Sequence, residues 1–154
     1  MSYAINLTWA QADSPQGASV NTVDHRIAFS GGLTTTMTSA PDYDGNPRFV
    51  NPEEAMAAAL SSCHFMTFLA LCTKAGWKLS GYRDRAVATL GKMENGRMRV
   101  DSITLHPVTA FASGQDRPRA EVVEMHERAH RYCFVANALN CEMNVVVAEE
   151  GSAA

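Results

Sequence analysis

Four cysteines are the residues of this sequence best suited to chemistry, because a thiolate is both a nucleophile and a redox group. They are Cys63, Cys72, Cys133 and Cys141. Cys63 falls in the middle of a long, mostly apolar segment with the composition of a helix, where burial opposes thiolate formation. Cys63 is therefore either an inert core residue or a thiol that a neighbouring cation activates, and its position alone leaves both alternatives open.

The other three cysteines have different expected surroundings. Cys72 lies nine residues after Cys63, on the opposite face of the same helix, which predicts core packing. Cys141 is expected to fill space in the last strand. Cys133 ends one helix and begins a turn, where backbone N–H groups can lower the pKa of a thiol. Cys63 and Cys133 are 70 residues apart, so only a fold that stacks their two helices brings them together.

A second pattern with catalytic potential is the H-E-x-x-H sequence from His126 to His130, on a segment that favours a helix. Two histidines four residues apart share one helix face and can bind zinc, and Glu127 would then activate water. Such a site needs a third protein ligand, yet His130 is the last histidine of the chain. A zinc hydrolase with His126 and His130 as ligands is the weaker reading, and we expect both histidines to be structural.

The elements that must position these residues follow one another with clear boundaries. A β region over about 1–50 is followed by a helix over about 51–76, a β-hairpin over about 79–111, a second helix over about 118–132 and a strand over about 141–148. Asn95-Gly96 is a strong turn signal for the hairpin. This order predicts one α+β domain over residues 1–154, with mainly antiparallel sheets.

The first helix has a well-defined start, with Asn51 as the N-cap and Pro52 at its first position. Its apolar residues surround most of its circumference, which predicts a central helix buried on nearly all sides. Leu60, Cys63, Thr67 and Leu71 fall on one stripe of this helix, and further apolar residues spread around the rest. His64 points in a different direction from Cys63, so we expect a hydrogen-bonded structural histidine and not a general base.

Composition excludes several classes of function. The chain has 154 residues, 46% of them hydrophobic, and a net charge of −3, as a globular domain does. It has no basic surface signal for nucleic acid, no uniformly apolar stretch for a membrane span and no N-terminal secretory signal. We therefore expect a cytoplasmic protein whose cysteines are thiols.

Two separated motifs resemble those of the OsmC/Ohr family of thiol peroxidases. The first runs from Asn51-Pro52-Glu53-Glu54 through an alanine-rich helix to Ser61-Ser62-Cys63-His64, and the second is the segment His130–Ala138 around Cys133. The resemblance extends in order from about Val23 to Val147. It implies an intertwined homodimer in which β-sheets wrap around two central helices, with two active sites at the dimer interface.

The resemblance also implies a mechanism without a cofactor. Cys63 matches the peroxidatic cysteine, which attacks an organic hydroperoxide and becomes a sulfenic acid. Cys133 matches the resolving cysteine, which condenses with the sulfenic acid to form an intramolecular disulfide. A dithiol reductant, of the lipoyl type in the family, then restores both thiols.

An arginine and a glutamate complete the site that the resemblance implies. Glu53 matches the glutamate that orients an activating arginine, but Leu33 follows the Gly-Gly turn where organic hydroperoxide resistance proteins have that arginine. Arg48, in the loop before the helix, is preferred to Arg26 on a β-strand. Glu53 precedes Cys63 by about 15 Å of helix, so either the arginine bridges this distance or the helix breaks.

A binding function is the alternative from another class. These departures from the family pattern leave open a non-catalytic OsmC-like dimer that binds a small apolar ligand. The chain has eight methionines, and with the aromatic residues some of them could line such a pocket.

Overall fold

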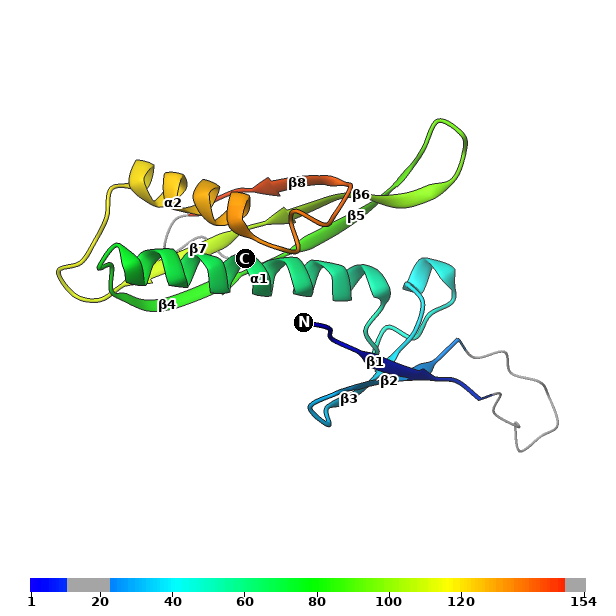
Figure 1. Cartoon of the computed structure of the whole chain (residues 1–154). Coiled ribbons are helices and arrows are strands. Elements are labelled where there is room, and N and C mark those ends of the chain that lie inside the picture. The colour runs from blue at the N-terminus through cyan, green and yellow to red at the C-terminus, as the bar shows by residue number, and fades with distance from the viewer. Residues whose placement is uncertain (11–22, 149–154) are drawn as a thin grey trace. The chain divides into compact units, whose positions relative to one another are not determined.

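The computed structural model describes residues 1–10 and 23–148, so the part of the expected β region at residues 11–22 lies outside the described residues. The chain separates into two compact units, Met1–Ala55 and Met56–Ala154. Each unit is described by itself, with the elements labelled in Figure 1. The α+β class predicted from the order of elements is confirmed.

The first unit is built on a small antiparallel sheet. Its strands, in spatial order, are β1 (Ile5–Thr8), β2 (His25–Phe29) and β3 (Thr34–Met37). Gly32 permits the tight turn between β2 and β3, because its φ of 88° is disfavoured for other residues. A short 3₁₀ helix, Pro41–Tyr43, follows the sheet.

Helix α1 (Pro52–Lys74) begins and ends almost where the sequence predicts. The N–H of Glu54 donates to Oδ1 of Asn51 at 2.8 Å, and the N–H of Asn51 donates to Oε2 of Glu54 at 3.1 Å. This reciprocal capping satisfies two N–H groups that a helix start otherwise leaves without partners. At the other end, Gly76 adopts a φ of 74°, as a helix-terminating glycine does.

The buried side of α1 is narrower than predicted. The side chains that are fully buried form the stripe Ala57, Leu60, His64, Phe68 and Cys72. This stripe contains His64, whereas the neighbouring Cys63 is half-buried. Met66 and Leu69 are exposed, so the expectation of burial on nearly all sides is wrong for the single chain. Within the described part of the second unit, strands and a second helix pack against one side of α1.

By length and composition alone, α1 could cross a membrane. The core helix of a globular domain meets the same criteria, and α1 carries a buried histidine in the stripe that packs against the rest of its unit.

The predicted hairpin consists of four strands, because each of its two arms is interrupted. Its strands are β4 (Leu79–Asp84), β5 (Val87–Lys92), β6 (Met98–Leu105) and β7 (Pro107–Phe111). β4 pairs with β7 and β5 pairs with β6, both in antiparallel register. The carboxylate of Asp84 accepts a hydrogen bond from the N–H of His106 at 2.7 Å, and this contact lies where both arms break.

Two further elements complete the second unit. Helix α2 (Arg119–Tyr132) has the predicted extent, and β8 (Glu142–Val145) is shorter than the predicted strand. β8 pairs with β6 in parallel, the one exception among the described strand pairs to an antiparallel arrangement.

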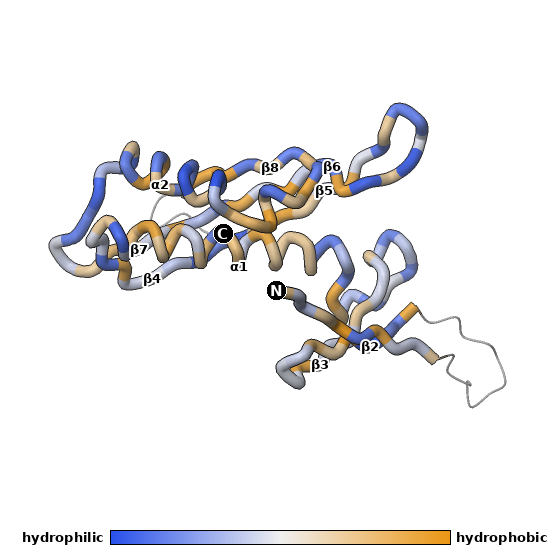
Figure 2. Tube along the Cα trace, viewed as in Figure 1, coloured by the Kyte–Doolittle hydropathy of each residue, from blue (hydrophilic) through white to orange (hydrophobic). Residues whose placement is uncertain are grey.

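Two apolar clusters hold α1 against its neighbours. The first joins α1 to β6 and to the segment after α2, and its buried members are Ala57, Leu60, Ile103, Leu105, Cys133 and Ala136. The second joins α1 to α2 through Phe68, Cys72, Met125 and Ala129. Figure 2 shows hydrophobic residues along much of α1 and polar residues in the loop between β5 and β6. Both helices therefore take their positions from the same core.

Candidate active site

The structure brings Cys63 and Cys133 together. Cys63 lies in the middle of α1, and Cys133 is the C-cap of α2, where the backbone turns extended at φ −72° and ψ 117°. The two side chains form a hydrogen bond with each other, and both are free thiols. The stacking of α1 on α2 thus places two cysteines 70 residues apart in direct contact.

A turn after Cys133 supplies the other polar contacts of this pair. The helix ends at Cys133, and the N–H of Asn137 donates to the carbonyl of Cys133 at 3.0 Å to close the turn. The backbone N–H groups of Phe134 and Val135 donate to the sulfur of Cys63, and that of Ala136 donates to Sγ of Cys133 at 3.4 Å. Successive N–H groups that point toward one place favour a negative charge there.

These donors favour the thiolate of Cys63. Burial by itself raises the pKa of this cysteine, but hydrogen bonds from Cys133, from the N–H groups of Val135 and Phe134, and from Thr67 outweigh it. The pKa of Cys63 therefore lies below the ordinary value of a thiol. Because Cys63 is only half-buried, an external molecule can reach the nucleophile.

Cys133 behaves in the opposite way. Burial, together with its hydrogen bond and charge interaction with Cys63, raises the pKa of Cys133 to about 11. The N–H groups of Ala136 and Val135 lower the pKa of Cys133, as expected for a turn, but burial and Cys63 outweigh them. Of the two thiols, Cys133 therefore keeps its proton to higher pH and donates it to the sulfur of Cys63.

The remaining cysteines have the surroundings of packing residues. Cys72 is fully buried against Phe68, Met125 and Ala129, and burial raises its pKa to about 11, so the predicted core role is confirmed. Cys141 is half-buried against the first cluster and lies immediately before β8, not within it.

The other predicted site residues lie in the first unit. Glu53 is half-buried, and its Oε2 is buried without a hydrogen-bond partner among residues 1–10 and 23–148. Arg48 and Arg26 are both exposed. Helix α1 is continuous from Glu53 to Cys63, which excludes the alternative in which the helix breaks. The roles of Glu53 and of either arginine stay predictions.

Next to the thiol pair lies a buried pair of histidines that sequence reasoning missed. His64 is 0% exposed and His126 is 1% exposed, and Nε2 of His64 lies 2.9 Å from Nδ1 of His126. Their ring planes differ by 3°, and Phe68 stacks on His126 with ring centroids 3.9 Å apart. The expectation that His64 is a hydrogen-bonded histidine is confirmed. Its sequence signal was its position between Leu60 and Phe68 in an apolar stripe.

Both histidines are neutral at pH 7. Burial, with the charge of His130, lowers the pKa of His64 to about 4. Burial, with the charge of His64, lowers the pKa of His126 to about 3. The pair therefore shares one hydrogen bond between two uncharged rings.

His126, which a zinc site would need as a ligand, is instead hydrogen-bonded to His64. Nδ1 of His126 faces His64, and its Nε2 lies 3.4 Å from Oγ1 of Thr109. Neither ring nitrogen of His126 is directed toward a metal position shared with His130. In the described part of the chain, no group of three or more His, Cys, Asp and Glu residues could hold a metal ion.

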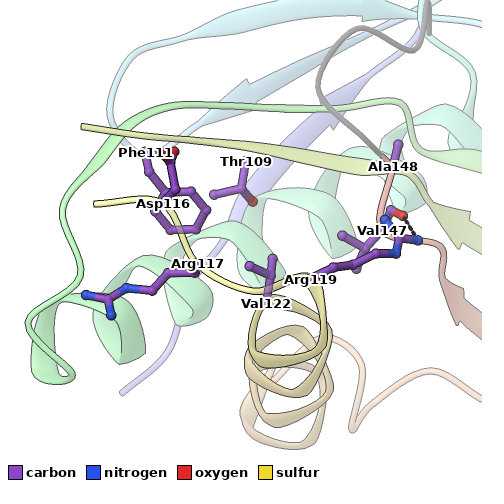
Figure 3. A pocket seen from close by; sticks show the side chains of 8 residues that line it. All are labelled: Thr109, Phe111, Asp116, Arg117, Arg119, Val122, Val147 and Ala148. Carbon is purple, nitrogen blue, oxygen red and sulfur yellow. Dashed lines mark hydrogen bonds between the residues drawn. The ribbon is translucent and has the colours of Figure 1, made fainter. Parts of the chain in front are cut away.

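A pocket of about 300 Å³ lies at the N-terminal end of α2, whereas Cys133 ends the same helix. Its lining consists of Thr109, Phe111, Asp116, Arg117, Arg119, Val122, Val147 and Ala148 (Figure 3). Arg119 donates to the carbonyl of Val147 at 2.9 Å, and the guanidinium of Arg117 lies 5.4 Å from the ring centroid of Trp77. The lining combines apolar side chains with two cations, Arg117 and Arg119, and the carboxylate of Asp116, so it suits a small, mostly apolar molecule with a polar group.

Comparison with known proteins gives a consistent result. Residues 44–148 match the family model described as OsmC-like protein. A solved OsmC-like protein of unknown function from Vibrio cholerae superposes with a TM-score of 0.89 at 30% identity, over 96% of this chain and 99% of that one. No curated protein matches the sequence significantly.

Two organic hydroperoxide resistance proteins share the fold. The one from Elizabethkingia anophelis has a TM-score of 0.74 at 20% identity, over 96% of this chain and 97% of its own. OhrB of Bacillus subtilis has a TM-score of 0.68 at 17% identity, over 97% of this chain and 98% of its own.

Proposed function

Because the chain belongs to the family of OsmC-like proteins, we propose that it is a thiol-dependent peroxidase that reduces organic hydroperoxides. The observation that carries the proposal is the half-buried Cys63, whose pKa is lowered by donors that include the thiol of Cys133. Organic hydroperoxide resistance proteins have the same fold, which supports a role in peroxide resistance.

The proposed reaction has three steps. The thiolate of Cys63 attacks the terminal oxygen of the peroxide, the O–O bond breaks, and the alkoxide takes a proton to leave as an alcohol. Cys63 is then a sulfenic acid, oxidised by two electrons. Cys133 attacks that sulfur, the S–S bond forms, and hydroxide leaves and takes a proton to become water. A dithiol reductant of the lipoyl type then reduces the disulfide by thiol–disulfide exchange.

The proposed site also draws on the first unit and on a second chain. Glu53 would orient Arg48, or Arg26, toward the thiolate, and the unpartnered buried Oε2 of Glu53 supports this because a buried carboxylate oxygen needs a donor. Proteins of the OsmC/Ohr family are dimers, and the exposed apolar residues Met66 and Leu69 on α1 support a homodimer here.

The first prediction concerns activity. With an alkyl hydroperoxide and a dithiol reductant, Cys63→Ser should lower the rate of peroxide consumption at least about 100-fold, because the nucleophile is lost. Cys72→Ser is the matched control on the same helix and should keep the wild-type rate. After one equivalent of peroxide, mass spectrometry should detect a loss of two hydrogens and a peptide cross-linked through Cys63 and Cys133. Equal rates for wild type and Cys63→Ser would contradict the proposal.

A binding function is the second candidate, and the pocket at the start of α2 favours it. In this version the chain is a non-catalytic OsmC-like dimer, and its ligand is a small apolar molecule whose polar group meets Arg119. Failure of the Cys63–Cys133 cross-link to form in the same experiment would favour binding over catalysis.

A further inference from the structure

The hydrogen bond between His64 and His126 ties together the two helices that carry the thiols. His64 follows Cys63 directly on α1, and His126 precedes Cys133 by seven residues, about two turns, on α2. The two helices run in opposite directions in Figure 1. If one helix shifts along the other, the distance between the two sulfurs and the distance between the two ring nitrogens both change.

The apolar part of the contact between α1 and α2 does little to fix this register. Phe68 and Cys72 meet Met125 and Ala129 through apolar surfaces alone. Apolar contact is non-directional, and methionine adapts its shape to its surroundings. A hydrogen bond at 2.9 Å between two coplanar rings is directional and tolerates little displacement.

Burial makes loss of this bond unfavourable. Both rings are excluded from water, so a displaced helix would leave nitrogens of His64 and His126 without a water molecule to replace the lost partner. Nδ1 of His64 already lacks a hydrogen-bond partner in the described structure. The polar groups around the pair are Thr109, Tyr82, His130 and Asp84.

We propose that His64 and His126 are positioning residues, whose hydrogen bond sets the register of α1 against α2 and thereby holds Cys133 against Cys63. The catalytic consequence, fast closure of the disulfide after Cys63 is oxidised, rests on the proposed peroxidase function. The positioning itself does not, because any oxidant that joins the two thiols reports on it.

The experiment measures the effective concentration of the two thiols from the equilibrium of the Cys63–Cys133 disulfide in glutathione redox buffers. The test variant is H64F/H126F, which replaces both partners by apolar rings of similar shape and leaves no buried nitrogen unpaired. We expect an effective concentration at least about 10-fold lower than in wild type. The matched control M125L changes an apolar residue of the same helix contact and should leave the value unchanged.

Rescue separates positioning from general stability. In H64Q the side-chain amide reaches the place of Nε2, and in H126N it reaches the place of Nδ1, so each can keep the hydrogen bond. Both should recover most of the lost effective concentration. Denaturant unfolding of the reduced proteins shows whether stability has changed as well. If H64F/H126F does not fold, the single variant H126L replaces it, and the same decrease in effective concentration, at least about 10-fold, is expected.

The outcomes distinguish this inference from the proposed function. An unchanged effective concentration in the folded apolar variant, or no rescue by H64Q and H126N, would overturn the positioning role. If Cys63 of the wild type does not react with an alkyl hydroperoxide, the peroxidase proposal is overturned. If the effective concentration is nevertheless high in wild type and falls in the variant, the positioning role is upheld. Wild type that forms no disulfide in glutathione buffers would overturn the positioning role directly.

Discussion

At the scale of residues, two identical thiols differ because of their neighbours. Cys63 accepts hydrogen bonds from Cys133 and from two backbone N–H groups, whereas the buried Cys133 donates its proton. The family resemblance singled out both cysteines, whereas the position of Cys133 at a helix end led us to expect activating amides at Cys133. Backbone N–H groups carry no residue signature, so only the path of the turn reveals which sulfur they face.

The donor role of Cys133 leads to a prediction about its removal. Cys133→Ala deletes the side-chain hydrogen bond to Cys63, so the pKa of Cys63 should rise toward the ordinary thiol value. Less thiolate is then present at neutral pH, and alkylation of Cys63 by iodoacetamide at pH 7 should slow several-fold. Cys72→Ala should not change this rate. An unchanged rate in Cys133→Ala would mean that the backbone amides suffice.

At the scale of elements, the sequence predicts where each helix begins and ends better than it predicts which side of the helix is buried. Caps and turn residues located both helices within one or two residues, because Asn51 and Gly76 act locally. Which side of α1 is buried does not follow from the sequence, since apolar residues on nearly all sides give no preferred direction. The interruption of both hairpin arms depends on Asp84 and His106, whose contact joins residues 22 apart in the chain.

The histidine pair between α1 and α2 predicts acid sensitivity. In the unfolded chain a histidine has its ordinary pKa near 6.5, whereas the folded values are about 4 for His64 and about 3 for His126. Below pH 6.5 the unfolded state binds more protons, so the free energy of unfolding should fall as the pH decreases toward 4. Each histidine contributes at most ~1.4 kcal/mol per pH unit.

Urea unfolding between pH 7.5 and 4.5 measures this slope. Asp84 and His130 also act on His64, so H64F/H126F is the reference that removes both titrating rings but keeps those neighbours. Its slope should be clearly smaller. Equal slopes for wild type and variant would show that other groups cause the acid sensitivity.

At the scale of the whole molecule, one side of α1 carries exposed apolar side chains among the described residues. Met66 is 58% exposed on that side, and in the first unit Ile5 and Leu7 are exposed on the same face of β1. Exposed apolar surface of this kind marks an interaction site. Sequence alone could not separate surface buried within one chain from surface buried between two, because the residue types are the same.

A charge on this side of α1 should weaken association. Met66→Glu places a carboxylate on the surface proposed to face the second subunit, where loss of hydration is unfavourable. We expect the dimer dissociation constant from sedimentation to rise at least about 10-fold. Met98→Glu, at a residue of similar exposure on β6, is the control and should sediment as wild type does. Identical sedimentation of both variants would contradict the proposed interface.

The turn after Cys133 has a consequence for the oxidised protein. The N–H groups of Phe134 and Val135 converge on the sulfur of Cys63 and favour its thiolate. In a disulfide that sulfur is neutral and a poor acceptor, so the turn loses the acceptor of both N–H groups. Phe134, whose side chain is 85% exposed, is then held less firmly. The conformation of this exposed turn therefore differs between the reduced and the oxidised protein, and a reducing partner could recognise the difference.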